Sequence, residues 1–186
     1  MALATTTTTL VTAEEFLARP AAGRTELLEG RVVEMAPAGE EHSFIGTALV
    51  SRLSVWANAA RAGRVYGADL GITVSRDPDT VLSPDGAFIA AARIGSGVQR
   101  GFLAVVPDLI VEVVSPSDRR VEVLAKVVTW LEAGAQVVWL VWPESQTVQV
   151  WTSPDYAVTV PRDATLTCPA LLPGFELPLA EVFPAD

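Results

Sequence analysis

Two acidic residues occupy positions in this sequence where a carboxylate could do chemistry. Glu112 lies within the apolar run at 109–114, where a buried carboxylate has to be paired, metal-bound or functional. Asp85 follows Ser83-Pro84 at the start of another apolar run. If the two runs are neighbouring strands, both carboxylates can converge on one divalent cation, because oxygen ligands suit Mg²⁺ or Mn²⁺. The alternatives are a simple Pro-Asp-Gly turn at Asp85 and a solvent-exposed face at Glu112.

Lys126 is the only lysine, and the other twelve of the 13 basic residues are arginine. Arginine stays protonated and presents a broad planar fork, whereas lysine is a compact charge whose pKa responds to burial and neighbours. On the helix expected at 119–133, Lys126 lies at the border of the polar face, so its stem can cross apolar surface while its ammonium points elsewhere. The alternative is an ordinary solvated lysine.

Strands and helices have to position these three side chains. A capping box at Thr12-Ala13-Glu14-Glu15 predicts a short helix that ends before Pro20. Apolar periodicity predicts two longer helices, at 41–62 and at 119–133, the second with a buried stripe of Val121, Leu124, Val128 and Leu131. A hairpin is expected within 26–35, and further strands at 64–74, 85–91, 109–114, 136–142, 147–151 and 157–160.

This order of elements predicts one domain over residues 1–186, with an α/β or α+β fold. We expect a single mixed sheet with helices packed on it. Half of the residues are hydrophobic and 19% are charged, as is typical of a globular domain.

Charge and cysteine content narrow the class of protein. The net charge of −9 argues against a general nucleic-acid coat protein, but a carboxylate cluster that binds cations is compatible with an enzyme acting on nucleic acid. The lone Cys168 indicates a reducing compartment. The N-terminus lacks the features of a signal peptide, and no apolar run approaches the ~20 residues of a membrane helix. We therefore expect a cytoplasmic protein without a membrane partner.

The sequence resembles the Uma2 family, also called DUF820, a branch of the PD-(D/E)XK nuclease superfamily described as candidate restriction endonucleases. The resemblance rests on these segments: 26–30 with Met35, His42, 83–85, 107–117, Lys126, Gly134 with 138–141, and 172–175. In the wider superfamily the lysine follows the acid by two residues, and Val114 stands there in this chain. In the Uma2 pattern the lysine lies on the following helix, where Lys126 is found fourteen positions after Glu112.

The resemblance implies a restriction-endonuclease-like mixed β-sheet core flanked by helices, and a metal-dependent DNA endonuclease. Asp85 and Glu112, with a backbone carbonyl near Val113, would hold Mg²⁺ (or Mn²⁺), which lowers the pKa of a water and neutralises charge on the phosphate. Lys126 would orient that water or stabilise the developing charge. Glu26 resembles the family's additional acid, and its alternative is a solvated charge on a hairpin.

Three further residues are secondary candidates. Arg119 and Arg120 follow the Glu112 strand closely and are expected to contact phosphate. His42, the single histidine, is a possible general base, although a lone histidine at a helix start is more often a cap or a residue at the edge of the core. By analogy with symmetric duplex cleavage, we expect a homodimer with DNA as substrate. The alternatives are an inactive nuclease-like binding module and a phosphodiesterase acting on RNA or small nucleotides.

Overall fold

The computed structural model describes residues 10–20, 23–98 and 100–184. The ends of the predicted domain, residues 1–9 and 185–186, lie outside the described residues. Within this part of the chain, twelve strands form three sheets. The expected α+β class is confirmed, but the prediction of a single sheet was wrong.

The largest sheet has six strands in the order β10-β9-β8-β7-β6-β3. Only β7 and β8 pair in parallel, so the sheet is mixed. Its strands are β3 (Gly63–Gly67), β6 (Gly86–Ala90), β7 (Leu109–Val113), β8 (Val137–Trp142), β9 (Thr147–Ser153) and β10 (Tyr156–Pro161). The helix α3 (Arg120–Glu132) connects the two parallel strands, as a crossover between parallel neighbours requires.

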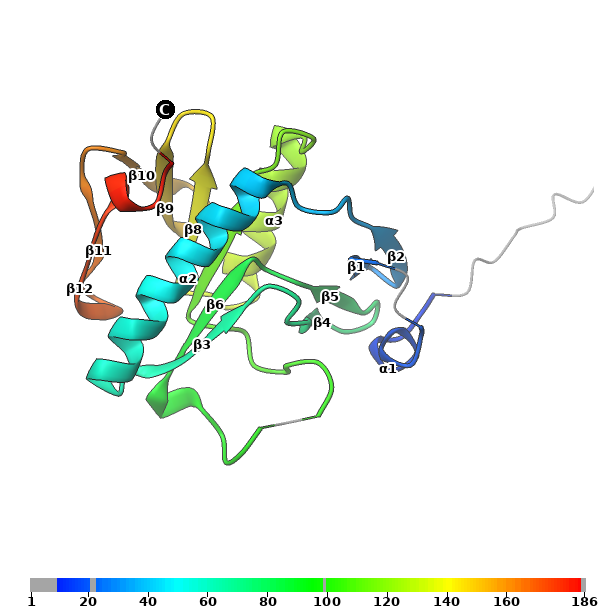
Figure 1. Ribbon diagram of the computed structural model, residues 1–186. Helices are drawn as coiled ribbons and strands as arrows, with labels where there is room; N and C mark the ends of the chain where they lie inside the picture. Colours follow the sequence, from blue (N-terminus) through cyan, green and yellow to red (C-terminus); the bar gives the residue numbers. More distant parts are fainter. Residues whose placement is uncertain (1–9, 21–22, 99, 185–186) are drawn as a thin grey trace, which may run out of the picture.

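Helices cover the two faces of the six-stranded sheet. In Figure 1, α2 (Glu40–Ala60) crosses in front of the sheet and α3 lies behind it. Along β7, Leu109, Val111 and Val113 belong to the core on the α2 side, whereas Ile110 belongs to the core on the α3 side. Because both faces are covered, β7 reads as an almost continuous apolar run. Glu112 lies on the same face as Ile110 and points toward α3.

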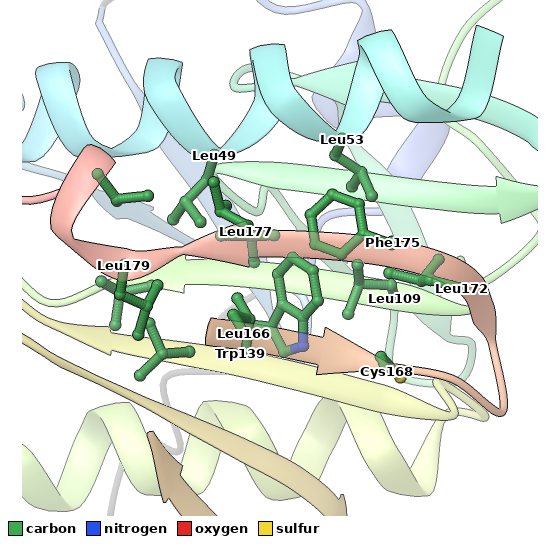
Figure 2. Packing of buried hydrophobic residues seen from close by; sticks show 14 of the residues in the cluster. Leu49, Leu53, Leu109, Trp139, Leu166, Cys168, Leu172, Phe175, Leu177 and Leu179 are labelled. Carbon is green, nitrogen blue, oxygen red and sulfur yellow. The ribbon is translucent and has the colours of Figure 1, made fainter. Parts of the chain in front are cut away.

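A small hairpin closes the core on the α2 side. It is formed by β11 (Thr165–Cys168) and β12 (Leu172–Pro178). Figure 2 shows Leu49 and Leu53 of α2 above Leu177 and Phe175 of β12, with Trp139 of β8 beneath them. Phe175 stacks on Trp139 with their ring centroids 5.6 Å apart. The sequence analysis did not predict this hairpin. Cys168, the single cysteine of the chain, lies in it as a buried free thiol.

The third sheet is antiparallel and has four strands in the order β2-β1-β5-β4. It contains the predicted hairpin as β1 (Thr25–Leu28) and β2 (Arg31–Glu34), together with β4 (Ile72–Ser75) and β5 (Thr80–Leu82). Glu29 and Gly30 have φ values of 48° and 74°, the left-handed conformation that a two-residue hairpin turn needs. This turn fixes the register in which Glu26 pairs with Val33.

The small helix α1 (Ala13–Leu17) has the predicted capping box, with Thr12 and Glu15 bonded reciprocally. It is attached through Asp79, whose Oδ2 accepts a hydrogen bond of 2.7 Å from the Ala13 N–H.

Two predictions of secondary structure were wrong. The strand expected at 64–74 is divided between β3 and β4, which lie in different sheets. Asp69 lies between them with φ 70°, a left-handed conformation that ends an extended run. On α3, Val121 is 76% exposed, and the buried side chains are Val127 and Trp130. Leu124 and Leu131 of the predicted stripe do pack, partly buried, against this core. The face that α3 turns to the sheet is therefore rotated from the predicted one and overlaps with it.

The N-terminal end of β7 is fixed by Asp108, which is fully buried. Its carboxylate accepts hydrogen bonds from the Ala90 N–H at 2.8 Å and from Arg93 Nη1 at 2.7 Å. Gln136 donates to the same carboxylate from the start of β8. Asp108 is thus a structural acid that joins three adjacent strands.

Candidate active site

Asp85 lies beside Glu112 at the end of the six-stranded sheet. The next residue, Gly86, pairs with Val111 in the antiparallel ladder of β6 and β7, so the predicted neighbouring strands are confirmed. The Asp85 N–H donates to the Val111 carbonyl at 3.0 Å. Its Oδ2 accepts from the Val113 N–H at 2.8 Å. The Asp85 side chain therefore takes the place of a backbone partner where the ladder ends.

The side chains of Arg24 and His42 contact the Asp85 carboxylate, and Asp85 is only 6% exposed as a residue. Arg24 Nη2 lies 2.9 Å from Oδ1, and His42 Nε2 lies 3.2 Å from Oδ2. Burial raises the pKa of Asp85, but His42, the Val113 N–H and Arg24 outweigh burial and lower that pKa below its ordinary value. Asp85 is therefore held as a carboxylate.

His42 lies in the first turn of α2, where it pairs with Asp85 instead of capping the helix. The residue at the N-cap is Gly39, and no side chain caps this helix. The hydrogen bond to Asp85 raises the pKa of His42 above its ordinary value, against the opposing effect of burial. Its Nδ1 is buried and has no hydrogen-bond partner in the described part of the chain. The structure thus brings this secondary candidate into the site.

Glu112 is 8% exposed and accepts hydrogen bonds from α3, so the solvent-exposed alternative is wrong. Trp130 Nε1 donates to Oε1 at 2.7 Å, and Lys126 Nζ lies 3.2 Å from Oε2. Burial and the neighbouring carboxylates of Asp85 and Glu26 raise the pKa of Glu112 to about 7, despite the opposing effects of Lys126 and Trp130. Burial is the largest of these effects, so Glu112 takes up a proton more readily than an exposed glutamate.

Lys126 bridges two carboxylates. Its Nζ lies 2.9 Å from Glu26 Oε1 as well as within reach of Glu112, and its side chain is 20% exposed. Burial lowers the pKa of Lys126, but Glu112 and Glu26 outweigh burial and raise it above its ordinary value. The alternative of a solvated lysine is wrong, because this ammonium is part of a buried ionic network.

Glu26 projects from β1 and is 3% exposed, so it is not a solvated hairpin charge. Its Oε1 accepts from the Ser83 N–H at 2.9 Å in addition to Lys126. Ser83 lies in the segment that leads from β5 to β6, so this bond ties the four-stranded sheet to the six-stranded sheet. We call Glu26, Asp85 and Glu112 the acidic cluster.

Arg24 and Trp130 are the contacts that sequence reasoning missed as site residues. Arg24 precedes β1 and belongs to no motif that would single out one of twelve arginines. Trp130 follows Lys126 by one helical turn, and its place one turn from a suspected site lysine is the signal that could have identified it.

The predicted phosphate-binding arginines lie on the surface near the start of α3. Arg119 pairs with Glu122 at 2.9 Å, and the guanidinium of Arg120 lies over the Trp142 ring, 5.1 Å from its centroid. Among the described residues, no ion pair joins either arginine to the acidic cluster. The structure therefore does not bring them into direct contact with Asp85 or Glu112.

The acidic cluster fits a hard divalent cation in the chemistry of its donors. Buried carboxylates on neighbouring strands supply oxygen ligands, and Mg²⁺ is commonly held by only one or two protein carboxylates. Within the described ranges, no three acidic, histidine or cysteine side chains are grouped closely enough to hold a metal ion together, so such a cation would rely on two carboxylates. Each oxygen of Asp85 and Glu112 already accepts a bond from a protein donor. A cation bound there would therefore displace one of these donors from its carboxylate oxygen or share that oxygen with the donor.

Comparison with solved structures defines the class of this fold. The chain is similar to the crystal structure of "a putative nuclease belonging to DUF820" from Anabaena variabilis ATCC 29413, with a TM-score of 0.78 and 25% sequence identity. The match covers 93% of this chain and 97% of the other. The fold is therefore a nuclease fold, with a mixed sheet and flanking helices.

The family follows from the sequence itself. Residues 13–180 match the model of the Uma2 family, described as "Putative restriction endonuclease". This chain belongs to the Uma2 family, and the predicted resemblance is confirmed. A comparison with curated proteins found no match. Among the described helices, none is long and apolar enough to cross a membrane.

Proposed function

We propose that this chain is a metal-dependent DNA endonuclease that hydrolyses phosphodiester bonds at the acidic cluster. The observation that carries the proposal is the contact of Lys126 with both Glu112 and Glu26. A buried lysine between two acids, next to a third acid on the neighbouring strand, combines a cation-binding site with a fixed positive charge. Family membership and the similarity to a nuclease support the same reaction class.

Asp85 and Glu112 would hold Mg²⁺ or Mn²⁺, with the Val113 backbone carbonyl as a further oxygen ligand. Such a cation lowers the pKa of water and offsets the negative charge that builds on a phosphate during displacement. The chain's own contribution is to hold the two carboxylates in place. Asp85 is oriented by the Val113 N–H, and Glu112 by the Trp130 indole.

Lys126 would supply electrostatic stabilisation and not act as a base. Its raised pKa keeps the ammonium protonated at neutral pH. Glu26 and Glu112 fix the direction of the Nζ donors, so little reorganisation is needed when charge develops on a phosphate oxygen or when a water has to be oriented. Glu26 is in this scheme a positioning residue for Lys126.

A plasmid-nicking assay tests the proposal. Supercoiled DNA is incubated with Mg²⁺ or Mn²⁺ and with wild type, Asp85→Asn, Glu112→Gln and Lys126→Met. We expect nicking by wild type but not by these three variants, and loss of the wild-type nicking when EDTA is added. Glu181→Gln is a matched control, because Glu181 is an exposed acid on the surface that pairs with Arg52. Equal nicking by all variants, or none by wild type on any nucleic acid, contradicts the proposal.

One observation favours a second candidate function, an inactive nuclease-like binding module. The oxygens of Asp85 and Glu112 are all satisfied by protein donors, so the network is complete without a cation. DNA binding that is unaffected by divalent cations, with no hydrolysis, would support this module. RNA and cyclic or linear dinucleotides belong in the same assay, since a phosphodiesterase with another substrate would hydrolyse them in preference to DNA.

The proposed duplex cleavage also suggests a homodimer, in which a second copy supplies the site for the other strand. Sedimentation of the protein with and without DNA tests whether a second copy is present. One protein chain per particle, both free and bound to DNA, contradicts the homodimer.

A further inference from the structure

Arg24 makes an incompletely satisfied contact with the acidic cluster. Its Nη2 donates to Asp85 Oδ1 at 2.9 Å and to the Ser83 carbonyl at 3.2 Å. Its Nε is buried and has no hydrogen-bond partner among the residues that the structure describes. A guanidinium carries five N–H donors, and a bidentate carboxylate contact would use two nitrogens. Arg24 therefore reaches Asp85 with one nitrogen only.

The two oxygens of Asp85 are held in different ways. Oδ2 accepts from the backbone N–H of Val113 at 2.8 Å and from His42, both of which belong to packed elements. Oδ1 accepts from Arg24 alone among the described residues. A cation that binds Asp85 without breaking the end of the β6–β7 ladder therefore has to use Oδ1.

Arg24 can withdraw without disturbing the hairpin. The Arg24 carbonyl accepts a hydrogen bond of 2.8 Å from the Met35 N–H, which fixes the backbone. The side chain is 20% exposed, so a change of rotamer can move the guanidinium toward solvent. A divalent cation and a guanidinium on one carboxylate oxygen repel each other strongly in a buried site.

We propose that Arg24 occupies the cation position on Asp85 in the free protein, and that metal binding requires its displacement from Oδ1. This inference rests on the proposed function, because it assumes a metal at Asp85. Arg24 is then an internal competitor, which keeps the buried carboxylate paired when no metal is bound and sets how tightly the metal binds.

Calorimetric titration of metal-free protein with Mn²⁺ tests the competition. We expect Arg24→Gln to bind Mn²⁺ roughly tenfold more tightly than wild type, about the effect of losing one charge-assisted hydrogen bond. Asp85→Asn should abolish the site. Arg93→Gln is the matched control, because Arg93 pairs with the buried Asp108 at 2.7 Å at the other end of β7. It should bind Mn²⁺ as wild type does.

Thermal unfolding gives a second readout that does not depend on activity. Without metal, Arg24→Gln should unfold at a lower temperature than wild type, because Asp85 loses a partner. Adding Mn²⁺ should raise the unfolding temperature more in the variant, since tighter binding stabilises the folded state further. If Arg24→Gln fails to fold, Arg24→Lys keeps a cation near Asp85 and should still bind Mn²⁺ more tightly than wild type, because an ammonium is more strongly hydrated than a guanidinium and withdraws to solvent more readily.

The outcomes separate this inference from the proposed function. The proposed competition is wrong if Arg24→Gln binds Mn²⁺ as tightly as wild type or more weakly. If Asp85→Asn does not bind in the same experiment, the assignment of the metal to Asp85 still holds. If Asp85→Asn binds Mn²⁺ as tightly as wild type, or if neither wild type nor any variant binds Mn²⁺, the assignment of the metal to Asp85 is wrong. The inference about Arg24 is then wrong as well.

Discussion

Lys126 and Glu26 are separated by 100 positions in the sequence, and their Nζ and Oε1 atoms lie 2.9 Å apart. The lysine comes from the helix behind the six-stranded sheet, and the acid from the hairpin of the four-stranded sheet. The same ammonium also contacts Glu112. One positive charge therefore serves two buried carboxylates from two sheets.

Replacing this ammonium should cost stability as well as activity. Lys126→Met leaves Glu26 and Glu112 buried without their shared cation, and we expect a loss of about 3 kcal/mol in the free energy of unfolding. Urea denaturation in EDTA measures it. Arg119→Met removes an exposed cation that pairs with the exposed Glu122, and it should change stability little. Equal losses in both variants would show that Lys126 is not an essential part of the ionic network.

The indole of Trp130 should matter through its charge-assisted hydrogen bond. Trp130→Phe removes the donor at 2.7 Å from Glu112 Oε1, and we expect a loss of roughly 2 kcal/mol. Trp142→Phe is a matched control, because Trp142 Nε1 donates to the neutral Gln149 Oε1 at 3.0 Å. In urea denaturation, Trp142→Phe should lose less free energy of unfolding than Trp130→Phe. Since the Trp130 bond lowers the pKa of Glu112, Trp130→Phe should also move the titration of Glu112 above about 7, as NMR of the carboxyl carbon can show.

The pairing of His42 with Asp85 predicts a pH-dependent stability. The pKa of His42 is raised above its ordinary value of 6.5 by the hydrogen bond to Asp85. A raised pKa means that the folded state binds the proton more tightly, so the contribution is complete below pH 6.5 and is lost as the pH rises through the folded-state pKa. His42→Gln should therefore lower the unfolding temperature more at about pH 5.5 than at about pH 8.5. A difference from wild type that stays constant over this range would contradict the pairing.

Arg119 and Arg120 remain predicted phosphate contacts, and their exposure permits that role. Arg119→Ala and Arg120→Ala should each weaken binding of a labelled duplex and reduce the slope of log affinity against log salt by about one. The rate at saturating DNA should change little, because neither arginine contacts the acidic cluster among the described residues. Arg52→Ala is the control, because it removes a cation of α2 that pairs with Glu181. Unchanged salt slopes in Arg119→Ala and Arg120→Ala would remove both residues from the binding surface.

The sequence predicted the parts of this molecule that depend on local pattern. The strand with Glu112, the strand after Asp85 and the helix with Lys126 were all recognisable from their apolar patterns, and the family motif connected them. The hairpin β11–β12 was missed because its strands are short and Pro173-Gly174 interrupts β12. Its apolar residues become core residues by packing against α2 and the six-stranded sheet. Only the family resemblance assigned Glu26 to the site. The local pattern did not predict its contact with Lys126, since that contact depends on how two sheets meet. Arg24 was missed for the same reason.

The bond from the Val113 N–H to Asp85 Oδ2 makes a single amide proton a reporter of the site. Most amides of β7 are held by neighbouring strands, so their hydrogen exchange follows the opening of the sheet. The Val113 amide is held by a side chain, and its exchange follows the Asp85 carboxylate. If a cation takes Oδ1 alone, this amide stays protected, whereas a carboxylate that rotates to chelate with both oxygens releases it. Exchange at one position can therefore distinguish two modes of coordination without any substrate.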